Sequence, residues 1–184
     1  FIALVFIKFL ERTKKIFESI ASKTNLIISV IIGGFMIGLI GIFYPQVLGI
    51  GYDTIKTITS ISNGEVVIQT LIIILVLKIV ATSLTISSRG SVGLFIPALY
   101  VGGLSGLIYA QALNLHPASV YAIIGMGAVV AATSKSLLTG IVFVAETVGS
   151  SPIMFALLSA SISYFLTGRN SFYESQLNKK PSNK

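Results

Sequence analysis

Long apolar runs separated by short polar segments dominate the chain. Leu26 to Phe43 is an uncharged run of 18 residues, and Val92 to Leu115 is an uncharged run of 24. Val66 to Ile86 is a run of 21 that contains only Lys78. Because a helix of roughly 20 apolar residues spans a bilayer, we expect each run to cross the membrane. Three later runs, residues 118–134, 136–145 and 152–167, are shorter and predict half-helices that line a site at membrane depth.

The two ends of the chain carry most of the charge. Residues 1–20 alternate apolar and charged positions, which predicts an amphipathic or obliquely placed helix that ends near the cytoplasmic surface. Since basic residues flank membrane segments on the cytoplasmic side, we expect both termini there. The basic residues concerned are Lys8, Arg12, Lys14, Lys15 and Lys23 at the first end and Lys179, Lys180 and Lys184 at the second.

Composition supports a membrane protein and excludes other classes. The 184 residues are 54% hydrophobic and 10% charged, whereas soluble domains average about 25% charged residues. We therefore expect an all-α integral membrane protein that crosses the bilayer several times, in the cell membrane. The net charge of +7 flanks apolar runs, which argues against a nucleic-acid partner. Cysteine is absent and the single histidine has no partner pattern, so we expect no metal, no cofactor and no catalytic residues.

The stretch from Gly90 to Pro97 interrupts the apolar pattern. Two glycines and a proline, in Gly-Ser-Val-Gly-Leu-Phe-Ile-Pro, do not suit an ordinary spanning helix, but proline suits the first turn of one. We expect a non-helical segment buried in protein, followed by a helix that begins near Phe95. The bare N–H groups of that helix start carry partial positive charge and favour an anion.

Other breaks mark the remaining elements. Asn25 opens a helix in which four glycines, at 33, 34, 38 and 41, allow close packing, with Gly34 and Gly38 at the spacing of a membrane-packing motif. Tyr44-Pro45 ends this helix before a turn at residues 49–53. Lys78 snorkels, lines an aqueous path, or pairs with a carboxylate, and the first and last are favoured.

Residues 133–136 interrupt the helical segment 118–146, and two polar residues, Glu146 and His116, need an interpretation. Glu146 is either a proton donor or, as we favour, a carboxylate that caps a neighbouring helix. His116 is expected in a solvated loop. Gly168 to Asn170 end the last apolar helix, and a short polar cytoplasmic helix and tail follow at residues 170–184.

Four motifs, in order, resemble the CLC family of chloride channels and proton/chloride antiporters. Gly93-Leu-Phe-Ile-Pro97 resembles the family's G-x-F-x-P motif, and residues 45–52 resemble its proline, leucine-glycine and glycine-tyrosine turn. Residues 125–146 resemble its penultimate helix pair, and Tyr173 resembles the tyrosine that reaches back into the pore. The matches extend over nearly the whole chain.

The resemblance implies a homodimer with one pore per subunit, each built from two inverted repeats of tilted and broken helices. Residues 1–184 would be the second repeat and the final helix, and the N-terminal half would be missing. The main-chain N–H groups of Leu94, Phe95 and Ile96 and the hydroxyl of Tyr173 would bind chloride, the transported substrate. Gly90, Ser91, Gly93 and Pro97 would shape the site.

Several alternatives stay open. The same fold transports other small anions, such as fluoride or nitrate, and the chain is also compatible with a non-transporting membrane scaffold or half-subunit. Channel and antiporter are not distinguished, because the family's pore serine and gating glutamate belong to motifs that this chain lacks. A membrane enzyme is least favoured. The interpretation of Tyr173 as an interfacial anchor is the alternative to its pore role.

Overall fold

A computed structural model describes residues 1–23, 25–48, 68–148, 153–168 and 170–173, and every regular element among them is helical. The predicted all-α class is confirmed. The predicted turn at residues 49–53 and most of the predicted tail lie outside the described residues. The elements are α1 (Ile2–Lys23), α2 (Leu26–Phe43), the 3-10 helix η1 (Pro45–Val47), α4 (Ile68–Ser87), α5 (Phe95–Ala112), α6 (Ala118–Ser134), α7 (Leu137–Val148) and α8 (Ile153–Leu166).

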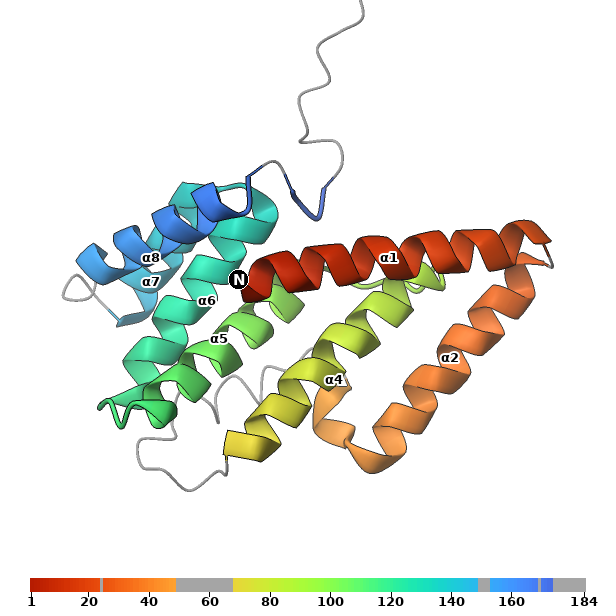
Figure 1. Ribbon diagram of the computed structural model, residues 1–184, viewed down its shortest axis with the longest axis horizontal. Coiled ribbons are helices and arrows are strands. Elements are labelled where there is room, and N and C mark those ends of the chain that lie inside the picture. Colours follow the sequence, from red (N-terminus) through yellow and green to blue (C-terminus); the bar gives the residue numbers. More distant parts are fainter. Residues whose placement is uncertain (24, 49–67, 149–152, 169, 174–184) are drawn as a thin grey trace, which may run out of the picture.

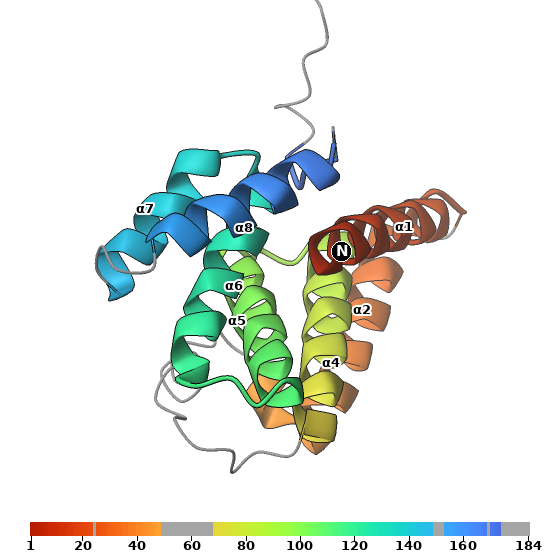
Figure 2. The ribbon, with the colours of Figure 1, turned by 60° about the vertical axis from the view of Figure 1, so that its left-hand side comes forward.

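Helix α5 is the centre of the structure. Its residues Tyr100, Val101 and Leu107 are completely buried. Helices α6, α7 and α8 lie on one side of it and α1, α2 and α4 on the other (Figure 2). Helix α1 runs across the C-terminal end of α4 and the N-terminal end of α5 (Figure 1), so a helix forms where the first pattern predicts one. Helices α2, α4 and α5 are long and apolar enough to cross a membrane.

Most predicted helix boundaries are confirmed, and each has a local cause. The Asn25 side chain accepts a hydrogen bond from the N–H of Ile27, which satisfies a donor at the start of α2. Helix α6 ends at Ser134 and α7 starts at Leu137, within the predicted break. The residue after Thr167, Gly168, has a φ of +57°, which favours glycine and ends the chain's last described helical turn.

The predicted start of a C-terminal helix at Asn170 is wrong for residues 170–173, which are not helical. The N–H of Phe172 donates to the carbonyl of Thr133 at 3.0 Å, and the N–H of Tyr173 donates to the Ser171 hydroxyl at 3.2 Å. These donors therefore tie the segment to the end of α6 and to its own Ser171 side chain.

Close packing is confirmed at two of the four glycines of α2 for which it is predicted. A Cβ atom at Gly33 would collide with the Ser88 side chain and one at Gly41 with the Leu48 side chain, whereas one at Gly34 or Gly38 would meet no atom within 4 Å. By contrast, a Cβ at Gly102 would lie 2.5 Å from the carbonyl oxygen of Gly125, and one at Gly106 would collide with the Tyr121 carbonyl. Helices α5 and α6 thus approach backbone to backbone, as small residues allow.

Candidate functional site

The candidate site is the start of α5, which follows a turn after α4. The N–H of Gly90 donates to the carbonyl of Thr85 at 2.7 Å, and Arg89 has a φ of 70°. A Cβ at Gly90 would lie 2.8 Å from that same carbonyl oxygen, so the tight turn requires glycine. Helix α5 then begins at Phe95, as predicted, with Leu94 as its N-cap residue.

The helix start leaves its N–H groups without acceptors. The first bond of the helix runs from the N–H of Ala98 to the carbonyl of Leu94, at 3.1 Å, and no side chain caps the helix. Within the described residues no hydrogen bond uses the N–H of Leu94, Phe95 or Ile96. Pro97 has no N–H to satisfy, as the proline-first-turn prediction anticipates. Three donors therefore converge at one helix end.

The segment that leads to the helix is exposed in this chain, so its predicted burial in protein is wrong here. Gly90, Ser91, Val92 and Gly93 are all exposed, and only Pro97 of the motif is buried. Ser91, Val92 and Gly93 line a cavity together with residues of α2 and α4. A Cβ at Gly93 would meet nothing within 4 Å, so no contact among the described residues requires glycine there.

Tyr173 lies beside the start of α5. It lines a small cavity of about 10 Å³, on the order of the space that one water molecule needs. We call this space the Tyr173-side cavity. The side chain of Tyr173 is 38% exposed. The structure thus brings Leu94, Phe95 and Tyr173 together across a long sequence separation. The lining residues are Leu94, Phe95, Ala98, Val130, Thr133, Ser134, Phe172 and Tyr173.

The end of α6 holds the segment that carries Tyr173. The carbonyl oxygen of Thr133 accepts two hydrogen bonds, from the N–H of Phe172 and from the hydroxyl of Ser171, both at 3.0 Å. The ring of Phe172 also contacts the ring of Phe6 of α1 edge-on, with centroids 4.7 Å apart. Residues 171–173 are therefore anchored from two helices.

Ile96 and Pro97 face a second, larger cavity of about 450 Å³, which we call the Lys78-side cavity. Sequence reasoning did not place Lys78 near the motif, although a lysine in an apolar run was a signal. Lys78 lines this cavity together with Ser91, Gly93, Thr82, Thr85 and others. The start of α5 therefore separates two cavities, and Ile96 does not share one with Tyr173.

Lys78 is buried, with 3% of its surface exposed. Its Nζ donates to the carbonyl of Val47 at 2.9 Å and lies 4.7 Å from the centre of the Tyr100 ring. The Tyr100 hydroxyl donates in turn to the carbonyl of Gln46 at 3.1 Å. Because Lys78 is buried among these groups, it does not snorkel, and its pairing with a carboxylate stays a prediction. The ammonium adds positive charge to the wall of the Lys78-side cavity.

Two other candidate residues are exposed. His116 lies in the loop between α5 and α6, as expected. Glu146 is exposed on α7, which continues past it to Val148, and it caps no helix among the described residues. Within those residues there is also no cluster of three or more metal-ligating side chains.

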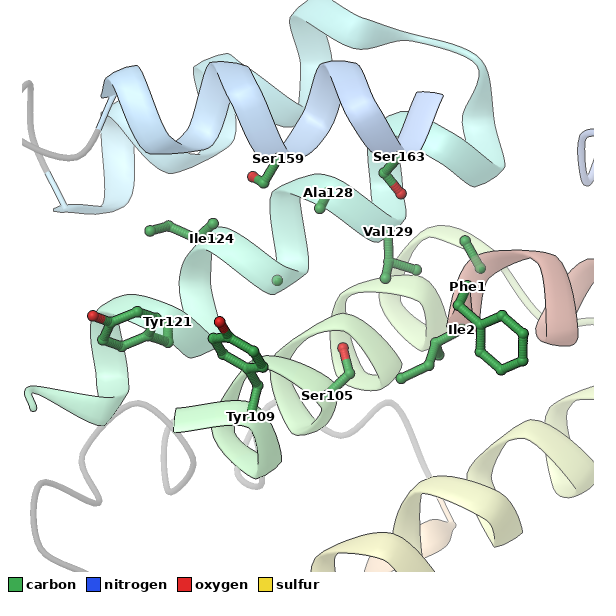
Figure 3. A pocket seen from close by; sticks show the side chains of 13 residues that line it. Phe1, Ile2, Ser105, Tyr109, Tyr121, Ile124, Ala128, Val129, Ser159 and Ser163 are labelled. Carbon is green, nitrogen blue, oxygen red and sulfur yellow. The ribbon is translucent and has the colours of Figure 1, made fainter. Parts of the chain in front are cut away.

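A third cavity, of about 390 Å³, lies between α5, α6, α8 and the start of α1 (Figure 3). It shares no lining residue with the other two cavities. Tyr109 and Tyr121 stand near each other at one end of it, with ring centroids 6.4 Å apart. These tyrosines offer a comparison for Tyr173, because they lie away from the start of α5.

Comparison with known proteins identifies the family. The family model described as voltage-gated chloride channel matches residues 1–168. The chain belongs to the voltage-gated chloride channel family. It is 33% identical over 172 residues to the H(+)/Cl(-) exchange transporter ClcA of Klebsiella pneumoniae, covering 86% of this chain and 36% of that protein. It is 29% identical to an uncharacterized protein of Methanocaldococcus jannaschii, covering 90% of this chain and 40% of that protein.

The fold agrees with this family. The crystal structure of a CLC-type fluoride/proton antiporter superposes with a TM-score of 0.81 and 24% identity, over 95% of this chain and 42% of that one. The chain therefore has a large part of the CLC fold, and it is an integral membrane protein. It spans about two fifths of the length of the relatives that it matches.

Proposed function

We propose that the complete protein transports chloride across a membrane and that this chain supplies one half of the anion site. In this proposal the N–H groups of Leu94, Phe95 and Ile96 and the hydroxyl of Tyr173 bind the ion. The observation that carries it is the uncapped start of α5, which opens beside Tyr173. The remaining part of the domain, which the longer relatives have, would complete the pore.

The physical basis is the concentration of positive potential at the helix start. Aligned peptide dipoles give a helix N-terminus roughly half an elementary positive charge, and three free N–H groups there can donate to one anion. Buried Lys78 adds a full charge on the Lys78-side cavity. In a bilayer such donors are costly unless a ligand, water or protein meets them, so an anion is the natural ligand.

Chloride is our choice of anion because the Klebsiella relative is named as a proton/chloride exchanger. Both a channel and a proton-coupled exchanger would use the same donors, and the proposal covers both. Fluoride and nitrate are alternative anions that a binding experiment separates directly. A scaffold without transport would bind none of the three.

Removing the Tyr173 hydroxyl tests the site. A hydrogen bond to a charged partner contributes roughly 1.5–3 kcal/mol, so Tyr173→Phe should weaken chloride binding by about tenfold or more. The measurement is calorimetric titration of the complete protein with chloride, fluoride and nitrate. The matched control is Tyr109→Phe, which removes the same atom from the third cavity. Equal affinities for wild type and Tyr173→Phe would leave Tyr173 as an interfacial anchor.

We also propose a homodimer that forms through α7 and α8. Leu138 of α7 and Met154, Phe155 and Phe165 of α8 are 65–74% exposed, which leaves a broad apolar surface. Replacing Phe165 or Met154 by a larger, polar-edged Trp should weaken self-association, and sizing in detergent should then show monomers. A Trp at Phe35 of α2, which is equally exposed, is the control. A dimer that withstands the α8 substitutions would move the interface elsewhere.

A further inference from the structure

The turn between α6 and α7 contains a lysine in an unusual backbone conformation. Lys135 has a φ of 54° and ψ of 34°, in the left-handed region, where a helix C-terminus ordinarily has glycine. A lysine loses backbone stability there relative to glycine. Its side chain must therefore contribute something that glycine cannot supply.

The Lys135 side chain reaches the end of α8, about thirty residues away. Its Nζ donates to the carbonyl of Tyr164 at 3.0 Å and to the hydroxyl of Thr167 at 2.7 Å, and it lies 4.8 Å from the centre of the Tyr164 ring. The Thr167 hydroxyl, which is buried, donates in turn to the carbonyl of Ser163 at 2.8 Å. The ammonium thus binds the last turn of α8, where carbonyl groups lack helical partners.

Thr133, two residues before Lys135, also anchors the segment that follows α8. Thr133 binds Ser171 and Phe172, as described above, while Lys135 binds the helix from which that segment starts. Between the two anchors, both the N–H and the side-chain amide of Asn170 donate to the carbonyl of Thr167, at 3.1 and 3.0 Å. The path from the end of α8 to Tyr173 is therefore fixed at both ends by the end of α6.

We propose that Lys135 is a positioning residue for Tyr173: it fixes the end of α8, so that residues 170–173 hold the Tyr173 hydroxyl at the start of α5. Lys135 lines neither cavity at the start of α5 and so does not itself touch the ion. This inference rests on the proposed function of Tyr173 in anion binding. In this proposal Lys135, which binds the end of α8, aligns Tyr173 with the anion site.

The variant that tests it is Lys135→Gly, because glycine suits the left-handed backbone and keeps the turn stable. Lys135→Arg keeps a cationic donor and is the rescue variant. Thr167→Val removes the buried acceptor while preserving volume and should act in the same direction as Lys135→Gly. All three are made in the complete protein.

The first readout is chloride affinity by calorimetry. Lys135→Gly should weaken binding several-fold, and Lys135→Arg should restore most of the affinity. If Lys135 acts through Tyr173, adding Lys135→Gly to Tyr173→Phe should cost little more than Tyr173→Phe alone. Fully additive losses, or an unchanged affinity in Lys135→Gly, would overturn the proposal.

The second readout is the placement of Tyr173, measured without any anion. This chain has no cysteine, so Leu94→Cys with Tyr173→Cys gives a defined pair for oxidative cross-linking in a complete protein whose remaining sequence is also free of cysteine. Cross-linking should slow in the Lys135→Gly background and recover in Lys135→Arg. An unchanged rate would overturn the positioning role. A slowed rate in a protein that binds no chloride would overturn the proposed function, and with it the role of Lys135 in binding, while leaving the anchor itself established.

Discussion

The two cavities on either side of the α5 start differ in size and in the side chains that line them. On the Tyr173 side a cavity of about 10 Å³ is closed by a segment that the end of α6 binds through Thr133. On the Lys78 side a cavity of about 450 Å³ is lined by a buried ammonium that binds the η1 carbonyl of Val47. The first side has a tyrosine in a small space, and the second has a lysine in a wide one. We infer that the Tyr173 side fixes where the anion binds and that the Lys78 side attracts the anion to the helix start.

The largest expected effect disrupts the packing of α5 on α6, the two helices that line the Tyr173-side cavity. Gly106→Leu would insert a side chain against the Tyr121 backbone, where even a Cβ collides, and so separate α5 from α6. Overpacking costs about 1–3 kcal/mol even where side chains can adjust, and here the obstacle is main chain. We expect a loss of at least about 3 kcal/mol, measured as a large fall in the thermal unfolding temperature in detergent. Gly38→Leu, at a position open in this chain, is the control and should be near neutral.

The next effect separates stability from binding. Lys78→Met would leave the buried Val47 carbonyl without its donor, which costs about 1–3 kcal/mol of stability, and would remove positive charge from the cavity wall. Both the unfolding temperature and chloride affinity should fall, whereas Tyr173→Phe should lower affinity alone. Exposed Lys15 of α1 provides the control, Lys15→Met. If Lys78→Met changed neither quantity, the comparison between a charged and a neutral side would fail.

The smallest effect concerns the two glycines before the helix. Gly90→Ala places a methyl group 2.7–2.8 Å from Thr85, so we expect a loss of about 1 kcal/mol or more as the turn shifts. Gly93→Ala meets no atom within 4 Å and should stay within about 0.5 kcal/mol of wild type. Chemical or thermal unfolding of both variants measures the difference. A Gly93→Ala variant that is stable yet loses chloride binding would show that the ion itself approaches Gly93.

Helix starts and ends could be predicted because local chemistry determines them. Asn25, the Gly90–Pro97 motif, the break before Leu137 and Gly168 each act within a few residues of their own position, and the structure agrees at each. The pairing of Leu94 and Phe95 with Tyr173 came from the family resemblance, and the structure brings these residues together. What pattern alone could not supply was long-range pairing.

Two features show why. Lys78 was correctly singled out, but its carbonyl partner lies 31 residues away, and nothing local identifies it. Gly34 and Gly38 of α2 carry the packing motif, yet the close approach in that helix occurs at Gly33, and backbones meet at Gly102 and Gly106, because which glycine meets a neighbour depends on the tertiary arrangement. The spacing of small residues predicts that a helix can pack closely, but it does not predict which helix is the partner.

The uncapped start of α5 has a consequence for acidity. Main-chain N–H groups carry no proton that they lose in the physiological range, so the three donors stay equally able to bind an anion in acid and in alkaline surroundings. A dependence of anion binding on pH would have to originate in ionisable side chains. The anion affinity of the helix end would then be independent of pH, and any proton coupling of the complete protein would come from other groups.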